Sequence, residues 1–133
     1  MVREVLLYLW QLPQNLLGLI VIAFTGAEFS SNYDVWETRK YSFGVSLGRY
    51  IIFGKHFEYT DLKHERGHQK QSLYLGWFYL IVIGLPSALG NLWDRLAHTP
   101  YWTNEERIEW YYKQPWEAWA DRLGGVQRSN EVL

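Results

Sequence analysis

The stretch His64-Glu65-Arg66-Gly67-His68 constrains this chain more than any other part of the sequence. On a helix, residues four apart lie on the same face, so both imidazoles can reach one metal ion. Glu65 follows the first histidine and is positioned to take a proton from a water on that metal. Two histidines leave a zinc ion short of one protein ligand, so the fold must bring a further donor back to this helix.

The stretch Glu117-Ala118-Trp119-Ala120-Asp121, about fifty residues downstream, is expected to supply that donor. Glu117 and Asp121 are again four apart, so one helix face can present both carboxylates. We expect Glu117 to complete the metal site and Asp121 to hydrogen-bond a ligand histidine and fix its tautomer. The chain has no cysteine, which leaves the histidine and carboxylate ligands that are typical of hydrolytic zinc sites.

Composition bounds the remaining possibilities. The 133 residues suffice for one domain, and the formal net charge of -1 with a pI near 6.4 argues against a nucleic-acid surface. Eight tryptophans and ten tyrosines are typical of proteins at the membrane–water interface, where amphipathic rings accumulate. An unusually aromatic soluble core is the alternative explanation of the same count.

Two apolar segments suggest contact with a membrane. Residues 5–24 are long enough for one membrane-crossing helix. The polar residues and proline at 11–15 are expected to kink this helix. A buried helix or a signal peptide is the alternative interpretation. Residues 25–41 are polar and are expected to form a loop. Residues 42–59 predict a short β-hairpin, which either offers an edge to an extended peptide or only covers the core.

The motif helix is expected over residues 60–84, capped by Thr60-Asp61 and running from a polar half into an apolar, membrane-embedded half. A single crossing would put Glu117 on the side opposite His64. The chain must therefore turn back or cross the membrane again before Trp116. The apolar run is too short for two full crossings, so we expect a shallow re-entrant element with Pro86 near its tip. Seven Lys and Arg residues lie within 25–72 and five after Trp93, which predicts that both polar regions face the cytoplasm.

The third ligand is expected on helices within residues 103–124. Thr103 and Glu106 form a capping-box pattern, Pro115 suits a first helical turn, and Gly124-Gly125 suits a helix end. The predicted fold class is α+β and mainly helical, in a single domain over residues 1–133. A short β-hairpin would lie beside a zincin-like pair of active-site helices, with further helices embedded in the membrane.

With its two motifs, the chain resembles the gluzincin metalloproteases, especially the integral-membrane branch of the CAAX prenyl proteases and the heat-shock protease HtpX. Those proteins carry His-Glu-x-Gly-His followed by Glu-x-x-Ala-Asp. The sequence is also similar to small uncharacterised bacterial membrane proteins, in the stretches KHERGHQKQS, LGWFYLIVIGLPS and ADRLGGV. The resemblance implies that His64, His68 and Glu117 bind one zinc ion. Glu65 would then act as general base, and Asp121 would hydrogen-bond a histidine ligand.

The expected activity is therefore zinc-dependent cleavage of a peptide or membrane-protein segment at a lipid bilayer, with the bacterial inner membrane as the expected location. Zinc suits the ligand set best, although manganese, cobalt and iron are also accepted by such sites. The oxyanion would be stabilised by one of four candidates, His98, Tyr111, Tyr112 and Arg122. Two alternatives remain: a structural metal site closed by His56 or His98, and a membrane protein in which the motif is coincidental.

Overall fold

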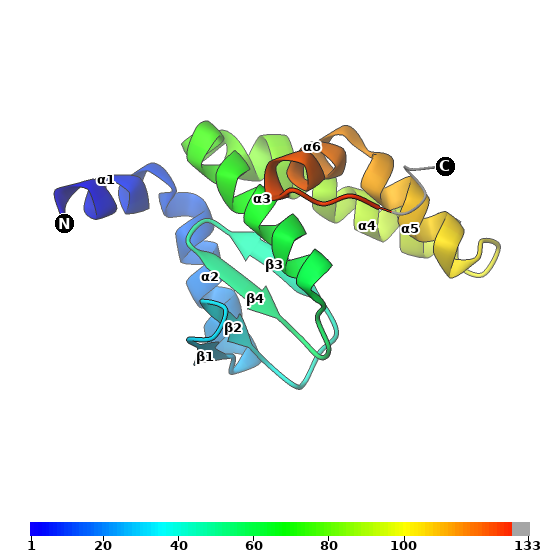
Figure 1. Cartoon of the computed structure of the whole chain (residues 1–133), viewed down its shortest axis with the longest axis horizontal. Helices are drawn as coiled ribbons and strands as arrows, with labels where there is room; N and C mark the ends of the chain where they lie inside the picture. The colour runs from blue at the N-terminus through cyan, green and yellow to red at the C-terminus, as the bar shows by residue number, and fades with distance from the viewer. Residues whose placement is uncertain (129–133) are drawn as a thin grey trace.

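The computed structural model describes residues 1–128, and this part of the chain is α+β and mainly helical (Figure 1). It contains six α-helices and one four-stranded mixed sheet, so the predicted fold class is confirmed at that level. In chain order the elements are α1 (Val2–Trp10), α2 (Leu12–Thr25), β1 (Glu28–Ser30), β2 (Val35–Glu37), β3 (Gly44–Leu47), β4 (Tyr50–Phe53), α3 (Tyr59–Leu75), a 3₁₀ turn η1 (Gly76–Phe78), a π turn η2 (Leu80–Gly84), α4 (Leu85–Ala97), α5 (Asn104–Lys113) and α6 (Pro115–Gly124).

The sheet has the strand order β1-β2-β4-β3, which leaves β3 at an edge. Strands β3 and β4 form the predicted antiparallel hairpin, and Gly48 supplies the positive φ of 64° that its two-residue turn requires. Strand β4 also pairs in parallel with β2, which pairs antiparallel with β1. The prediction of a loop over 25–41 is wrong, because β1 and β2 lie within this range. Strands of three residues are too short to show an alternating pattern in the sequence.

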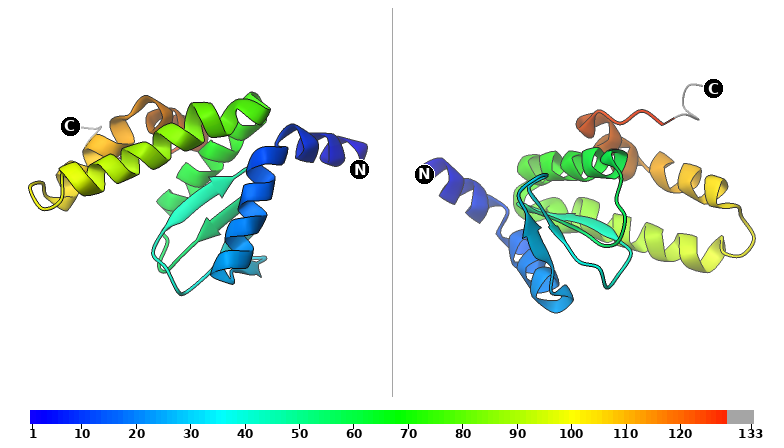
Figure 2. Two further views of the ribbon diagram at one scale, coloured as in Figure 1. Left: turned by 180° about the vertical axis from the view of Figure 1, so that it is seen from behind. Right: turned by 60° about the horizontal axis from the view of Figure 1, so that its bottom comes forward.

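The sheet is packed between helices on its two faces (Figures 1 and 2). On one face Leu47 and Ile52 pack with Val21 and Ile22 of α2. On the other face Ile51 and Phe53 pack with Leu62 of α3 and with Val35. Strand β4 therefore packs on the motif helix α3, and the neighbouring strand β3 also lies in contact with α3.

The N-terminal apolar segment is two helices rather than one. Helices α1 and α2 meet at an angle of 85° beside Gln11, within the polar stretch expected to cause a kink. These polar side chains face protein: the Gln14 side-chain amide donates to the Ser72 hydroxyl at 2.8 Å, and Ser72 donates to the side-chain oxygen Oε1 of Gln11 at 2.6 Å. Buried amides thus join α2 to the end of the motif helix.

The motif helix ends earlier than the sequence predicts. A capping box of Glu58 and Asp61 opens α3, in place of the expected Thr60-Asp61 cap, and the helix stops at Gly76, whose φ is 55°. The Trp10 ring fills the space a side chain at Gly76 would need, since a Cβ there would lie 2.2 Å from it. Pro86 does not end a helix, because it lies in the first turn of α4, where proline is tolerated.

The chain therefore does turn back, but between Gly76 and Tyr79 rather than near Pro86. The segments Tyr59–Phe78 and Leu80–Ala97 are bent by 119° relative to each other. Within residues 1–128 no single helix has the length and apolar composition to cross a bilayer. Only two bent pairs reach that composition together, namely Val2–Trp10 with Leu12–Thr25 and Tyr59–Phe78 with Leu80–Ala97.

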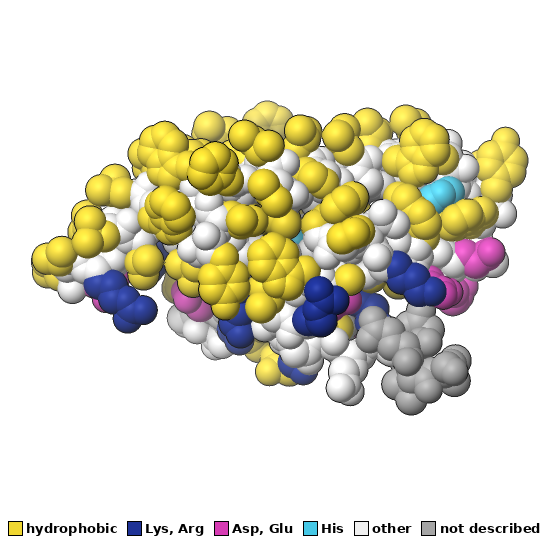
Figure 3. Space-filling view, turned by 90° about the horizontal axis from the view of Figure 1, so that it is seen from above, with side chains coloured by type: hydrophobic (Ala, Val, Ile, Leu, Met, Phe, Trp, Pro, Cys, Tyr) yellow, Lys and Arg dark blue, Asp and Glu magenta, His cyan; other side chains and the backbone are white. Residues whose placement is uncertain are grey.

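Apolar side chains gather on the outside of these bent pairs. No charged residue occurs within 5–27 or within 73–93. Figure 3 shows a surface on which hydrophobic side chains predominate, with charged side chains gathered along one edge. Among the large apolar side chains of the two bent pairs, the most exposed include Leu6, Ile20, Phe24, Trp77, Phe78, Ile81, Leu89, Trp93 and Leu96.

Helices α5 and α6 begin and end as their sequence predicts. The Thr103 hydroxyl accepts from the Glu106 amide, and the Glu106 carboxylate accepts from the Thr103 amide, which is the reciprocal capping box. Pro115 opens α6, and Gly125 closes it in the left-handed conformation. These two helices return the chain to α3.

Candidate metal centre

Helices α3 and α6 cross with their backbones in contact. A Cβ at Gly67 would lie 1.8 Å from the Ala120 carbonyl oxygen, and one at Gly124 would lie 1.9 Å from the Lys63 carbonyl oxygen. Only glycine permits this approach at these two points. The glycine in the fourth position of the motif therefore has a specific structural role, which is to let α6 lie against the histidine-bearing face.

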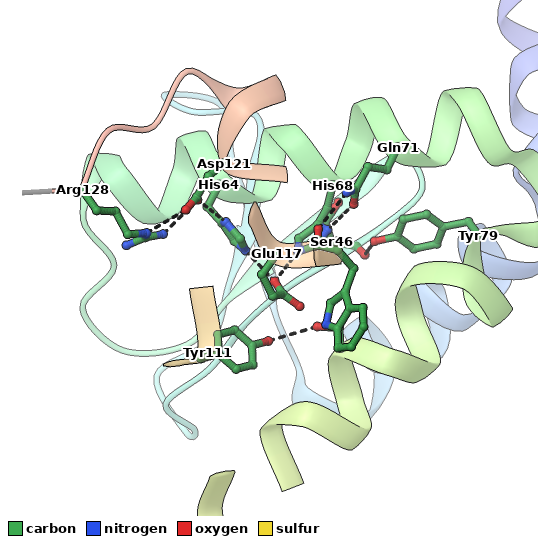
Figure 4. A network of polar contacts seen from close by, with 11 residues as sticks. Ser46, His64, His68, Gln71, Tyr79, Tyr111, Glu117, Asp121 and Arg128 are labelled. Atoms are coloured by element: carbon green, nitrogen blue, oxygen red, sulfur yellow. Dashed lines mark hydrogen bonds and ion pairs between the residues drawn. The ribbon is translucent and has the colours of Figure 1, made fainter. Parts of the chain in front are cut away.

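The crossing brings His64, His68 and Glu117 together (Figure 4). All three are buried, and one ligand atom from each lies within 4.8 Å of the other two. The Nε2 atoms of both histidines are 3.0 Å from the same Glu117 oxygen, Oε1. This group could hold one metal ion.

Each histidine is anchored through its other nitrogen. His64 Nδ1 lies 2.7 Å from Asp121 Oδ1, and His68 Nδ1 lies 2.6 Å from Gln71 Oε1. Gln71 must present its oxygen to His68, because its amide nitrogen donates to the Trp116 carbonyl at 2.9 Å. Both anchors accept hydrogen bonds, so both histidines carry a proton on Nδ1.

This tautomer leaves the Nε2 lone pairs of His64 and His68 facing the Glu117 carboxylate. Two lone pairs repel, so a cation must lie between each Nε2 and Oε1, as a proton or as a metal ion. The second Glu117 oxygen, Oε2, is buried and has no hydrogen-bond partner within residues 1–128. The donor set therefore fits a divalent cation such as zinc, which would satisfy both imidazoles and the carboxylate.

The ionisation of the ligand group agrees with this geometry. Burial opposes a charge on His64, but hydrogen bonds to Asp121 and Glu117 outweigh it and raise the pKa to about 9. Burial likewise opposes a charge on His68, whose pKa is nevertheless raised by its bond to Glu117. The two histidines outweigh the burial of Glu117 and hold the pKa of its carboxyl well below the ordinary value. Without a metal ion, protons lie between each histidine Nε2 and Glu117 Oε1, where the metal ion would bind.

Asp121 is held in turn by Arg128, a residue that the sequence analysis did not identify. The Arg128 guanidinium donates to both Asp121 oxygens, at 2.8 and 3.0 Å. It also lies 3.4 Å from the ring centroid of Tyr112, whose ring packs edge-on against His64. A chain of contacts thus runs from the C-terminal segment to the first motif histidine. Arg128 lies beyond the predicted helices, and no local pattern marks it.

Glu65 lies on the same helix but outside the ligand group. It is buried, and its Oε2 atom has no hydrogen-bond partner in the described part of the chain. Burial raises the pKa of its carboxyl, against the opposing effect of His68 and His64. A carboxylate with a raised pKa and an unpaired oxygen beside a metal group is suited to exchanging protons.

Two cavities of different character meet at Glu65. The smaller, of about 240 Å³, is polar and is lined by His64 together with Lys55, His56 and Asp61. The larger, of about 800 Å³, is mainly apolar and is lined by His68 together with side chains of α2, η2 and α4. Both cavities share five lining residues: Phe43, Gly44, Glu65, Asn91 and Tyr111.

The other residues singled out by the sequence lie at different distances from this group. Tyr111 and Tyr112 line the polar cavity, and Tyr111 lines both. His98 lies elsewhere, stacked on Trp102 and hydrogen-bonded to Asp94 at 2.9 Å. His56 lines the polar cavity but does not belong to the ligand group. Arg122 lines neither of the two cavities.

Comparison with models of protein families, with curated proteins and with solved structures gives no match to this chain. The likeness to gluzincins therefore depends on the two motifs and on the buried group that they form.

Proposed function

We propose that this protein is a zinc-dependent peptidase of the gluzincin type. His64, His68 and Glu117 would bind one zinc ion, and Glu65 would act as general base. The observation that carries the proposal is the position of Glu65: a buried carboxylate with an unpaired oxygen lies beside a complete ligand group and opens to two cavities. A metal site that served only to hold helices together would need neither the unpaired carboxylate nor the access.

The chain's own residues would carry the proton transfers. A bound zinc ion supplies Lewis acidity, which polarises a carbonyl and makes water more acidic. Glu65 takes the proton of the attacking water and later delivers it to the amine that leaves. Its position suits both steps, because a buried oxygen without a hydrogen-bond partner can accept a proton and hold it until the amine departs. Asp121 and Gln71 keep the two histidines in the metal-binding tautomer.

Tyr111 is the best supported of the four candidates for stabilising the developing negative charge. It lines both cavities at their junction with Glu65, and its hydroxyl exchanges a hydrogen bond with Ser87 at 3.0 Å. Burial and the nearby Glu117 raise its pKa, so it stays protonated and can donate. A Tyr111→Phe variant should keep its metal and lose about 10²–10³-fold in kcat, the usual effect of removing one such donor.

We further propose that the apolar surface of Figure 3 contacts a lipid bilayer, with the polar regions on the cytoplasmic side. Two long uncharged stretches and their exposed tryptophans support this placement. Flotation with phospholipid vesicles tests it. Protein that stays at the bottom of the gradient would contradict it.

Metal content of the detergent-purified protein tests the proposed function. The wild type should carry about one zinc per chain, His68→Ala should lose it, and Glu65→Gln should keep it. A peptide-library digest of the same three proteins should then give products with the wild type alone. Wild-type protein that takes up no metal after zinc is supplied would overturn the proposal. About one zinc per chain without any cleavage would contradict the peptidase activity and indicate a non-catalytic metal site.

A further inference from the structure

A third cavity adjoins the two that meet at Glu65. It has a volume of about 360 Å³, lies between α4 and α5, and is lined by polar side chains that include Arg95 and Arg107. Asn91 and Tyr111 line this α4–α5 cavity as well as the polar and apolar cavities, so the three adjoin one another at these two residues. A ligand bound at Glu65 can therefore extend into the α4–α5 cavity.

The two arginines of this cavity differ in whether their charge is neutralised. Arg107 donates to Asp94 Oδ2 from two nitrogens, at 2.9 and 3.1 Å, and His98 lies 2.9 Å from the other oxygen of that carboxylate. Arg95 has no hydrogen bond or ion pair with any group of residues 1–128. Within the same range, Asp94 is the only acidic residue that lines the α4–α5 cavity, and Glu65 is the only one that lines the apolar cavity. Arg95 therefore presents an uncompensated positive charge to both cavities.

Helical periodicity connects Arg95 to the proposed active site. Ser87, Asn91 and Arg95 are spaced four residues apart on α4, so they share one face, and all three line the apolar cavity. At the near end of this face, Ser87 is hydrogen-bonded to Tyr111 at 3.0 Å. The length of helix from Ser87 to Arg95 is about 12 Å, at about 1.5 Å per residue. An extended peptide advances about 3.3 Å per residue, so this length corresponds to roughly three to four peptide residues.

We propose that Arg95 binds a carboxylate of the substrate and makes the protein selective for peptides with an acidic group roughly three to four residues from the cleaved bond. The guanidinium fork matches the two oxygens of a carboxylate, and such a ligand would supply the partner that residues 1–128 do not provide. A C-terminal carboxylate and an acidic side chain share this chemistry. The assignment rests on the proposed function, but the binding can be measured without catalysis.

Arg122 is the matched comparison for Arg95. Both arginines are exposed and lie in the last turn of a helix, where the helix dipole stabilises a cation. Arg122, however, lines none of the three cavities. An effect that both arginines share would come from the helix end or from net charge, whereas an effect confined to Arg95 would come from the cavities.

Peptide binding to zinc-loaded Glu65→Gln protein tests the proposal, because this variant keeps the ligand group and lacks the general base. Three decapeptides with the same neutral fluorophore are compared by anisotropy in non-ionic detergent. The first is uncharged and ends in an amide, the second has a free C-terminal carboxylate, and the third is the first with a central glutamine replaced by glutamate. We expect at least one anionic peptide to bind at least tenfold more tightly than the uncharged one. The peptide that does so identifies the source of the carboxylate.

Arginine variants in the same Glu65→Gln background locate the carboxylate. Arg95→Gln should bind the anionic and the uncharged peptides equally, whereas Arg122→Gln should keep the preference. Arg95→Glu should reverse it, so that a peptide with a central lysine binds more tightly than the anionic one. Zinc content and thermal unfolding should be the same in all three variants, which separates a change of selectivity from a loss of folding.

Equal affinity for the charged and uncharged peptides, or equal loss of the preference in Arg95→Gln and Arg122→Gln, would overturn the proposed subsite. No peptide binding by zinc-loaded protein would also overturn it. If Arg95→Gln kept the peptide preference but floated less with phosphatidylglycerol vesicles, Arg95 would bind a lipid phosphate instead, which contradicts the proposal. Binding as expected, with no cleavage of the same peptide by the wild type, would uphold the carboxylate subsite and overturn the hydrolytic function.

Discussion

Replacing Gly67 by alanine should separate α3 from α6 and dismantle the metal centre. The new Cβ would lie 1.8 Å from the Ala120 carbonyl oxygen and 3.0 Å from Ala120 Cα. A carbon and a carbonyl oxygen in contact need about 3.3 Å. Because the obstructing atom is backbone, no side-chain rotation relieves the clash, and the two helices must move apart by more than about 1 Å.

That displacement is large compared with the tolerance of a metal site. Bonds from zinc to nitrogen and oxygen are about 2.0–2.2 Å long, and plausible sites keep them within about 0.2 Å. Moving Glu117 away from His64 and His68 removes at least one ligand. We expect zinc affinity to fall at least about 100-fold, or about 2.7 kcal/mol. Overpacking should cost a further ~1–3 kcal/mol of unfolding free energy, offset in part by the helix propensity of alanine.

Gly90→Ala is the matched control, since Gly90 is also a buried helical glycine. A Cβ there would have its nearest neighbour, in Trp116, at 3.9 Å, an ordinary contact. This variant should gain about 0.5–1 kcal/mol and keep its zinc affinity. Thermal unfolding of metal-free protein and competition with a chelating dye measure the two effects. If Gly67→Ala matched Gly90→Ala in both, the close helix crossing would not be what assembles the site.

Three further outcomes are expected. Asp121→Asn should lower zinc affinity about 10–100-fold, as measured by dye competition, because the anchor of His64 loses its charge. Between about pH 6.5 and pH 9, zinc affinity should rise at least tenfold per pH unit, because the metal displaces the His64 proton and also the His68 proton where that is still bound; the metal-free protein should lose stability over the same range, as the raised pKa of His64 requires. Thr103→Ala should cost about 1 kcal/mol on chemical denaturation without changing zinc affinity.

The sequence predicts which of these side chains share a helix face, because they are linked in pairs by helical periodicity. Residues four apart share a face whatever the surrounding fold, so the pairs on α3 and α6 follow from spacing alone. Gln71 and Arg128 were missed for a physical reason: their roles depend on which groups the tertiary fold places opposite them. Gln71 did carry one signal, since it lies three residues after His68 and hence on the same face.

The bend that begins at Gly76 is a feature that local spacing does not predict. A single glycine within an apolar run does not by itself end a helix, and Pro86 looked like the stronger breaker. The outcome depends on α1. The Trp10 indole donates to the Leu73 carbonyl at 2.8 Å, Trp77 donates to the Leu9 carbonyl at 2.8 Å, and the Trp10 ring occupies the space above Gly76. Such reciprocal contacts between distant segments leave no local pattern to detect.

The crossing of α3 and α6 also sets an order of assembly. The hairpin β3–β4 and helix α3 follow one another directly in sequence, whereas the contact of His68 with Glu117 spans 49 residues. Closing the longer loop has the greater entropic cost, so we expect α6 to dock last and to be released first in native-state fluctuations. A metal ion held across this crossing would then act as a latch. Amide hydrogens of α6 should exchange faster than those of β4, and zinc should slow the exchange of α6 most.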